Sequence, residues 1–484
     1  MPMIHFRHQR LGAQARTLFG MGLLAVATCG AADPTEDGPD VFRTEQALRR
    51  DVPGLVDPIG HDCATPGGKL TFTAAVQLAL CANPQTRTAW AQAHQQAATL
   101  GQQEAAWLPS ISATGSESRQ FGQHADVNGN ITSAAQNTDD AAVSLTWTLY
   151  DFGARSGRIE SAARLLDAAA LTANSVVQQT VRSVVQSYYG AVAGDASLEA
   201  AKSSEEIAAH SLEIARALQT GGAGTMGDVL QAQTAYEQAV LARVQAEAAA
   251  KVDRGTLSVT LGRDADQSFV LAANPVPDEV PALTARMADL MREATRQRPD
   301  LAAARYQVDA DEANIKVARA AGWPTISVET QHHFTSQTGV PNQDYNEIGV
   351  SITIPIFTGF SVTYGVRQAQ AALQVGEANL LQVGLNVTLD VWNGYYNLQS
   401  ANDQLKATAD LLKTAEQNEQ VSIGRYQAGV GSIVDVLTAQ AALATARQVR
   451  IAAELGWNVA RAQLAYALGR LTSAVPMAGL SPLP

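Results

Sequence analysis

Two aspartates stand at matching places in this sequence, each three residues after a hydroxyl side chain. Thr225 precedes Asp228, and Ser432 precedes Asp435. This spacing is typical of a capping box, in which the hydroxyl accepts a hydrogen bond from the start of a helix and the carboxylate accepts one from the N–H of the capping residue. Each aspartate is therefore expected near the first turn of a helix.

Motifs for catalysis or nucleotide binding are absent from the sequence. It contains no Walker A loop, no His-Glu-x-x-His, no Cys-x-x-Cys and no Gly-x-Ser-x-Gly. His332 and His333 are adjacent, and neighbouring side chains on a strand point to opposite faces, so this pair is not expected to share a metal ion. No enzymatic activity, cofactor or metal site is predicted.

Composition excludes further classes of protein. The formal charge is −12, so the chain lacks the basic surface that a nucleic-acid backbone requires. Hydrophobic residues make up 46%, which is too many for a disordered chain. Aromatic residues make up only 6%, so a core of small side chains on closely packed helices is expected.

The first 32 residues have the pattern of a secretory signal peptide, with three arginines before an apolar run over residues 18–27. Two cleavage sites remain open. Residues 26–29 resemble a lipobox that would make Cys29 the lipidated first residue, whereas ordinary cleavage after Ala27 or Ala32 fits equally well. No other stretch reaches the roughly 18 apolar residues of a membrane-spanning helix.

Export places the remaining cysteines in an oxidising compartment. Acylation or loss of Cys29 leaves Cys63 and Cys81, which are 18 residues apart. We predict that these two form a disulfide that ties the preceding segment to the first helix. In the chain-entropy model such a loop closure stabilises the fold by roughly 3 kcal/mol.

The chain repeats itself once. Residues 83–84 recur as 298–299, at a displacement of 215, and residues 261–263 recur as 468–470, at a displacement of 207. The difference arises between residues 109 and 148, so one loop of the first copy is expected to be eight residues longer.

Each copy contains one β-hairpin set between helices, because apolar periodicity changes from helical to strictly alternating and back. Helical segments before the hairpins end at a Trp followed by Pro. The expected segments are helix 70–107, strands 111–119 and 143–149 around a loop at 122–140, helix 283–321, and strands 326–329 and 348–354 around a loop at 337–346.

A long helical run follows each hairpin. Residues 153–219 and 361–427 are 67 residues each and contain no proline, so each would extend roughly 100 Å. The runs end at glycine pairs, after which a second helix returns to Leu261 or Leu468. These segments predict two antiparallel helical hairpins. The glycine pairs at their tips are Gly222 with Gly224 and Gly429 with Gly431.

Four strands cannot close a barrel. Within lipid every backbone polar group must be paired, so strands in a membrane would have to come from several identical chains. Aromatic residues flank the strands where an interfacial girdle would lie: Trp107, Phe121, Tyr150, Phe152, Trp323, Phe334, Tyr345, Phe357 and Phe360. The alternative is a soluble exported coiled-coil scaffold with two hairpins packed on its helices.

These features together resemble the TolC family of outer-membrane channel proteins, over about residues 70–470. The resemblance includes the sequence Pro-Ile-Phe-Thr-Gly at 355–359 and the segment Gly-x-Gly-Ser-Ile-Val-Asp-Val-Leu at 429–437. It implies a homotrimer whose twelve strands form one barrel in outer-membrane lipid, continued by an α-helical tunnel across the periplasm. It also implies two partners, a periplasmic adaptor and an inner-membrane transporter, in drug, metal or protein export.

The resemblance assigns roles to residues near the tips. The family has acidic residues near the position of Asp435 that narrow the pore, and a charged link to the aspartate matching Asp228 that helps hold it shut. Here Gly431 stands in place of the linking arginine and Thr438 in place of a second pore aspartate. Asp435, Asp228 and Thr438 are thus the pore candidates, and the four tip glycines are candidates for adaptor contact.

The predicted fold class is mainly α with a membrane β-barrel contribution, built from two tandem repeats. The expected divisions are a signal peptide at 1–32, a periplasmic segment at 33–69, a first repeat at 70–273, a linker at 274–282, a second repeat at 283–470 and a tail at 471–484.

Overall fold

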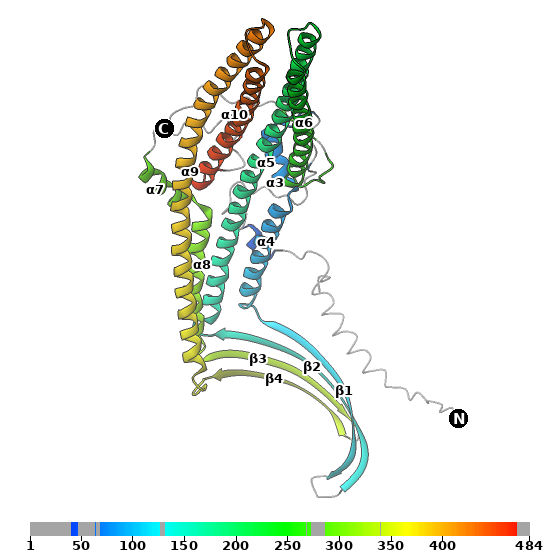
Figure 1. The fold of residues 1–484 in the computed structure, drawn as a ribbon. Coiled ribbons are helices and arrows are strands. Elements are labelled where there is room, and N and C mark those ends of the chain that lie inside the picture. The colour runs from blue at the N-terminus through cyan, green and yellow to red at the C-terminus, as the bar shows by residue number, and fades with distance from the viewer. Residues whose placement is uncertain are drawn as a thin grey trace, which may run out of the picture.

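The computed structural model describes residues 40–46, 63, 68–125, 131–267, 269–272, 286–338 and 340–471. Within these residues the molecule is elongated, with a row of long helices at one end and a curved sheet at the other (Figure 1). None of the described helices is both long enough and apolar enough to cross a membrane.

The two sequence repeats fold alike, each as two short helices, a hairpin and two long helices. The first repeat contains α3 (Phe72–Ala82), α4 (Pro84–Ala105), β1 (Ser110–Ala125), β2 (Ile131–Tyr150), α5 (Ala154–Thr220) and α6 (Met226–Thr260). The second contains α7 (Met287–Gln297), α8 (Pro299–Ala320), β3 (Thr325–Gln337), β4 (Val340–Thr353), α9 (Ser361–Gln427) and α10 (Ile433–Ala467).

The segments expected as single helices before each hairpin are each broken in two. Asn83 and Arg298 precede prolines and have extended backbones, with ψ near 128° and 119°. Proline disfavours the helical conformation in the residue before it but is well suited to the first position of a helix, so α4 and α8 begin there.

The long helices confirm the prediction from the sequence. Helices α5 and α9 have 67 residues each, and α6 and α10, which return along them, have 35 each. Alanines, leucines and valines make most of their buried apolar contacts, in five clusters among the described residues. In the first of these clusters, the buried Tyr188 hydroxyl donates to the carbonyls of Leu70 and Ala272, at 3.1 and 3.2 Å.

The four strands form one antiparallel sheet in the order β1-β2-β3-β4. They are longer than predicted, because regular pairing continues through the Gly- and Asn-rich stretches expected to be loops. Pairing of β1 with β2 runs to Ala125 and Ile131, and pairing of β3 with β4 runs to Gln337 and Val340. Backbone pairing between neighbouring strands therefore overrides the weak strand propensity of these residues.

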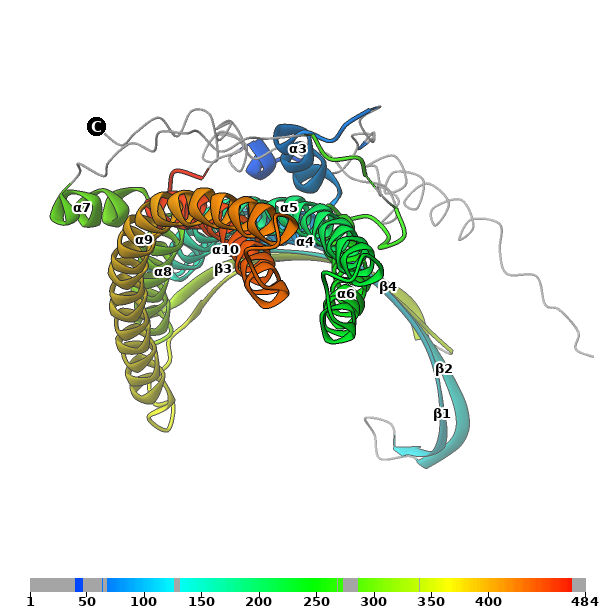
Figure 2. The same ribbon diagram turned by 45° about the horizontal axis from the view of Figure 1, so that its top comes forward.

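The eight-residue difference between the repeats appears as extra strand length. Pairing of β2 with β3 ends at Thr138, and β1 and β2 continue beyond it as a two-stranded ribbon. In Figure 2 the helices and the sheet curve in the same sense, with α6 and α10 on the concave side and α3 and α7 on the convex side.

Candidate functional site

The tips of the two helical hairpins are tight turns that require glycine. Gly222 and Gly429 have φ of 78° and 76°, a conformation that other residues rarely adopt. A Cβ on Gly224 or Gly431 would lie 3.1 Å from backbone nitrogen of the preceding helix. Both tips therefore pack the returning chain directly against the helix end.

Each returning helix starts with the capping box expected from the sequence. The Asp228 N–H donates to Thr225 Oγ1 at 3.1 Å, and the Thr225 N–H donates to Asp228 Oδ2 at 2.9 Å. Ser432 and Asp435 make the same pair of bonds at 3.2 and 3.3 Å. Both aspartates thus have a structural role at the first turn, whatever else they do.

Beyond capping, the two aspartates have different surroundings. Asp435 is exposed, and so is Thr438, one turn further along α10. Asp228 is half-buried. Burial raises the pKa of the Tyr426 hydroxyl on α9, and the negative charge of nearby Asp228 raises it further. The Tyr426 oxygen is buried and makes no hydrogen bond with the described residues. The structure therefore brings Asp228 to the contact between the hairpins and leaves Asp435 at the surface.

Polar side chains form a seam along part of the contact between α5 and α10, where the two hairpins meet. Gln440 donates to Ser211 Oγ at 2.6 Å, and Arg447 donates to Ser203 Oγ at 3.1 Å. Closer to the tips the hairpins also share an apolar cluster, which includes Leu212 of α5, Ala232 of α6 and Val436 of α10.

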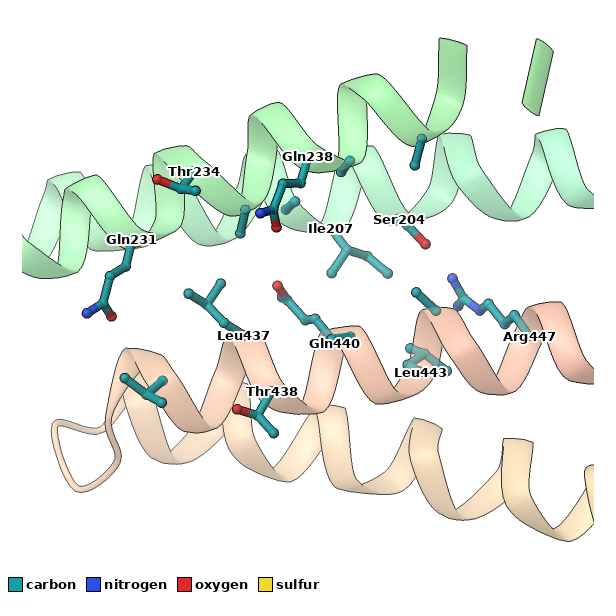
Figure 3. Close-up of a pocket in the computed structure, with 17 residues that line it drawn as sticks. Ser204, Ile207, Gln231, Thr234, Gln238, Leu437, Thr438, Gln440, Leu443 and Arg447 are labelled. Carbon is teal, nitrogen blue, oxygen red and sulfur yellow. The ribbon is translucent and has the colours of Figure 1, made fainter. Parts of the chain in front are cut away.

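Beside this seam a groove of about 770 Å³ opens between α6 and α10 (Figure 3). These two helices lie on the concave side of the helix row (Figure 2). Side-chain amides and hydroxyls line it together with Leu437 and Ile207, and Arg447 lies at one end. The hairpins of one chain therefore do not close on each other fully near their tips.

The sheet has one apolar and one polar face. On the apolar face, the row of cross-strand neighbours through Leu145 contains Ile111 and Ile348. On the polar face, the adjacent row through Thr146 contains Glu329. Most large side chains of the apolar face are exposed in the single chain, including Ile348 at 79%. The polar face also carries Asp140, Ser144, Gln331, His333 and Glu347.

His332 and His333 lie on opposite faces of β3. His332 pairs with Asn346 at 3.0 Å on the apolar face, whereas His333 lies 2.8 Å from Thr335 Oγ1 on the polar face. Among the described residues no group of three or more His, Cys, Asp or Glu is arranged to hold a metal ion.

Aromatic side chains gather where the sheet meets the helices, and a buried arginine packs on one of them. Phe152 stacks on Trp323 with ring centroids 5.4 Å apart. Arg155 lies 4.2 Å from the Trp107 ring and is only 4% exposed. It also pairs with Asp151 at 3.1 Å and donates to the carbonyls of Ala106 and Leu149.

Arg155 was not identified from the sequence, although its spacing of four residues from Asp151 was a usable signal. It joins the end of a helix, the end of a strand and the start of α5. The arginine thereby ties the sheet to the helices at this junction.

The structure joins Cys63 and Cys81 in a disulfide, with their Cα atoms 5.8 Å apart. This separation is within the range that an unstrained bridge requires. Arg263, at the end of the first repeat, donates to the Cys63 carbonyl. Cys29 lies outside the described residues, so its lipidation stays a prediction.

Comparison with known proteins gives one family and several relatives. The family model described as outer membrane efflux protein matches residues 75–263 and 290–470. Protein CyaE of Bordetella pertussis is 34% identical over 430 residues, which are 86% of this chain and 88% of that protein. The toluene efflux pump outer membrane protein TtgC of Pseudomonas putida is 26% identical and covers 76% of each chain.

Solved structures share the fold. CusC, described as forming a transmembrane channel, matches with a TM-score of 0.72 and 21% identity, over 90% of this chain and 99% of that one. The outer membrane protein VceC of Vibrio cholerae matches with a TM-score of 0.70 and 17% identity, over 82% and 96%.

Proposed function

Because the chain belongs to the outer membrane efflux protein family, we propose that three copies assemble into one channel, each giving four strands to a shared barrel. The protein is an outer-membrane channel with a long periplasmic helical portion and serves as the exit duct of an export system. This role sets aside the alternative of a soluble exported scaffold.

The open edges of the sheet carry the proposal of a trimer. Among the described strands, β1 and β4 each pair with one neighbour only, and β4 is exposed along its whole length. Unpaired backbone groups are not tolerated within lipid, so β1 of one copy must pair with β4 of the next. A closed ring of identical head-to-tail contacts satisfies every edge.

Exposed apolar side chains on the outermost helices support the same contact. Helices α9 and α6 lie towards opposite ends of the curved row (Figure 2). Unpartnered apolar side chains of this extent mark interaction surfaces. Those on α6 include Leu230, Leu241, Val244, Val252 and Val259, and those on α9 include Leu381, Leu385, Leu389, Trp392 and Tyr396. We expect α6 of one copy to pack against α9 of its neighbour.

In such a ring the apolar face of the sheet contacts lipid and the polar face lines the exit. Thr146, Gln331 and Glu347 would then lie in water inside the barrel. The concave side of the helix row would line the tunnel, because the convex side is covered by α3 and α7.

The tips would meet the partners that supply cargo and energy. We expect a periplasmic adaptor to contact the turns at Gly222, Gly224, Gly429 and Gly431, and an inner-membrane transporter to feed the channel. Asp435, with Thr438 and Asp228 nearby, would be repeated three times around the axis and form a cation-attracting constriction. The duct itself performs no chemistry.

Detergent extraction followed by mass measurement tests the assembly. We expect the protein to resist carbonate washing of membranes and to elute in detergent with three times the mass of one chain. Release by carbonate would contradict the barrel, whereas a detergent-extracted monomer would contradict the ring.

A further inference from the structure

The contact between the two repeats inside one chain shows how two copies can meet. Helices α4 and α8 are equivalent at a displacement of 215 residues, and α5 and α9 at 207. Within the chain, α5 packs against α8 of the second repeat. In the ring, α9 would meet α4 of the next copy in the same arrangement, because the order of the repeats continues across the subunit boundary.

The contact between α5 and α8 includes an ion pair near the sheet. Lys316 of α8 donates to both carboxylate oxygens of Glu160 of α5, at 2.9 and 2.8 Å. The two displacements put Arg367 of α9 in the place of Glu160, and Gly101 of α4 in the place of Lys316. At the subunit boundary the cation is therefore on the long helix, and the short helix has no side chain to pair with it.

The N-terminal segment 40–46, which we call the strap, covers the place of that missing side chain. Thr44 is 6% exposed and lies over Gly101, where a Cβ would be 3.7 Å from the threonine hydroxyl. The Asp40 carboxylate accepts hydrogen bonds from the N–H groups of Thr44 and Glu45, each at 3.0 Å. The Glu45 side chain is exposed. The strap thus brings two carboxylates to the point on α4 that corresponds to Lys316 on α8.

The charges on the two sides of this boundary are opposite in sign. Within the described part of the chain, Arg367 lies 5.4 Å from the Tyr364 ring and forms no ion pair. The strap carries one cation, Arg43, against its two carboxylates. Burial raises the pKa of Glu104 of α4, and the negative charge of nearby Asp40 raises it further. A cation supplied by a neighbouring copy would relieve this repulsion between carboxylates.

We propose that the strap of one copy binds α9 of the next, with Arg367 held by the carboxylates of Asp40 and Glu45. This contact takes the place of the pair between Glu160 and Lys316, with the signs of charge exchanged between the long and the short helix. The exchange also disfavours wrong neighbours, because α5 presents Glu160 and would meet like charges at a strap. The contact rests on the proposed trimer and identifies residues that join its copies.

Disulfide cross-linking of the assembled protein tests where the strap lies. With Arg367→Cys and Glu45→Cys in the same chain, oxidation should join the copies head to tail, so that covalent trimers survive on heated, non-reducing gels. Leu381→Cys with Glu45→Cys is the matched control, because Leu381 is also exposed but lies about 21 Å further along α9. The control should give monomers. The bridge between Cys63 and Cys81 lies within one chain and links no copies.

Charge reversal tests the ionic part of the contact. Arg367→Glu should lower the yield of trimer, most strongly at low salt, where its repulsion from the strap is least screened. Adding Glu45→Arg to that variant should raise the yield again. Arg319→Glu makes the same change at an exposed position of α8, which lies between helices of its own chain, and should behave as the parent.

Two results would overturn the contact. One is a trimer in which Arg367→Cys and Glu45→Cys cross-link no better than the control pair. The other is an Arg367→Glu variant with the parental yield at low salt, or one whose lowered yield Glu45→Arg does not raise. A parent protein that is monomeric in detergent would overturn the proposed trimer, and the contact with it.

Discussion

Placing an arginine at Leu145 tests which face of the sheet contacts lipid. Leu145 lies in the row that contains Ile111 and Ile348, on the face made of large apolar side chains. An arginine at the middle of a bilayer destabilises a barrel by about 2–4 kcal/mol. In the proposed barrel of three copies, the trimer would lose about 6–12 kcal/mol.

The neighbouring residue supplies a matched control. Thr146 is on the other face and pairs directly with Glu329 of β3. An arginine there would lie in the aqueous exit beside a carboxylate, an exposed pair that contributes only about 0–1 kcal/mol. The two variants carry the same new charge one residue apart, so charge alone cannot explain a difference between them.

A third variant tests how the penalty for arginine depends on the depth of the residue in the bilayer. Ile352 pairs with Ile326, which in turn pairs with Tyr150 at the end of β2 near the helices. The aromatic side chains where the sheet meets the helices lie at that level, and in the proposed barrel the penalty for arginine there would fall to about 0–1 kcal/mol. Ile352→Arg should therefore be tolerated better than Leu145→Arg, although both residues belong to the apolar face.

The assay is the yield of folded trimer after refolding into lipid vesicles, read on unheated gels, with urea titration for the variants that fold. Leu145→Arg should give little trimer, Ile352→Arg an intermediate amount, and Thr146→Arg the parental amount. Equal yields from Leu145→Arg and Thr146→Arg would refute the assignment of the faces. A lower yield from Thr146→Arg would mean that the faces are reversed.

Three further predictions concern other parts of the chain. Alkylation of the unfolded protein without reductant should leave Cys63 and Cys81 unmodified, and labelling of both would exclude the disulfide. Asp435→Asn should form normal trimers with weaker cation preference in bilayer recordings; if selectivity is unchanged and only thermal stability falls, Asp435 is a helix cap alone. Tyr188→Phe should lower the free energy of unfolding by about 1–3 kcal/mol in urea titration, because two carbonyls lose a buried donor. Parental stability would show that these bonds contribute nothing net.

Much of the helical architecture could be predicted because its signals are local. The absence of proline over 67 residues and the glycine pairs at the tips are enough to define α5 and α9. The capping boxes at Asp228 and Asp435 depend on residues three positions apart, so they too can be identified from the sequence.

Features that depend on distant residues could not be predicted. The ends of the strands were wrong because pairing with a neighbour, rather than propensity, sets their length. Arg155 gains its importance from carbonyls of residues 106 and 149.

The equal lengths of α5 and α9 restrict how this protein can change in evolution. Both helices start at the sheet and end at the same kind of turn after 67 residues. A helix rises 1.5 Å per residue, so deleting seven residues from one of them would leave its tip about 10 Å short of the other. The helix that returns along the shortened one, α6 or α10, would also lose its packing register with it. Viable length variants must therefore change all four long helices together and by similar amounts. An insertion or deletion in one half of the gene has to be matched by one of similar length in the other half.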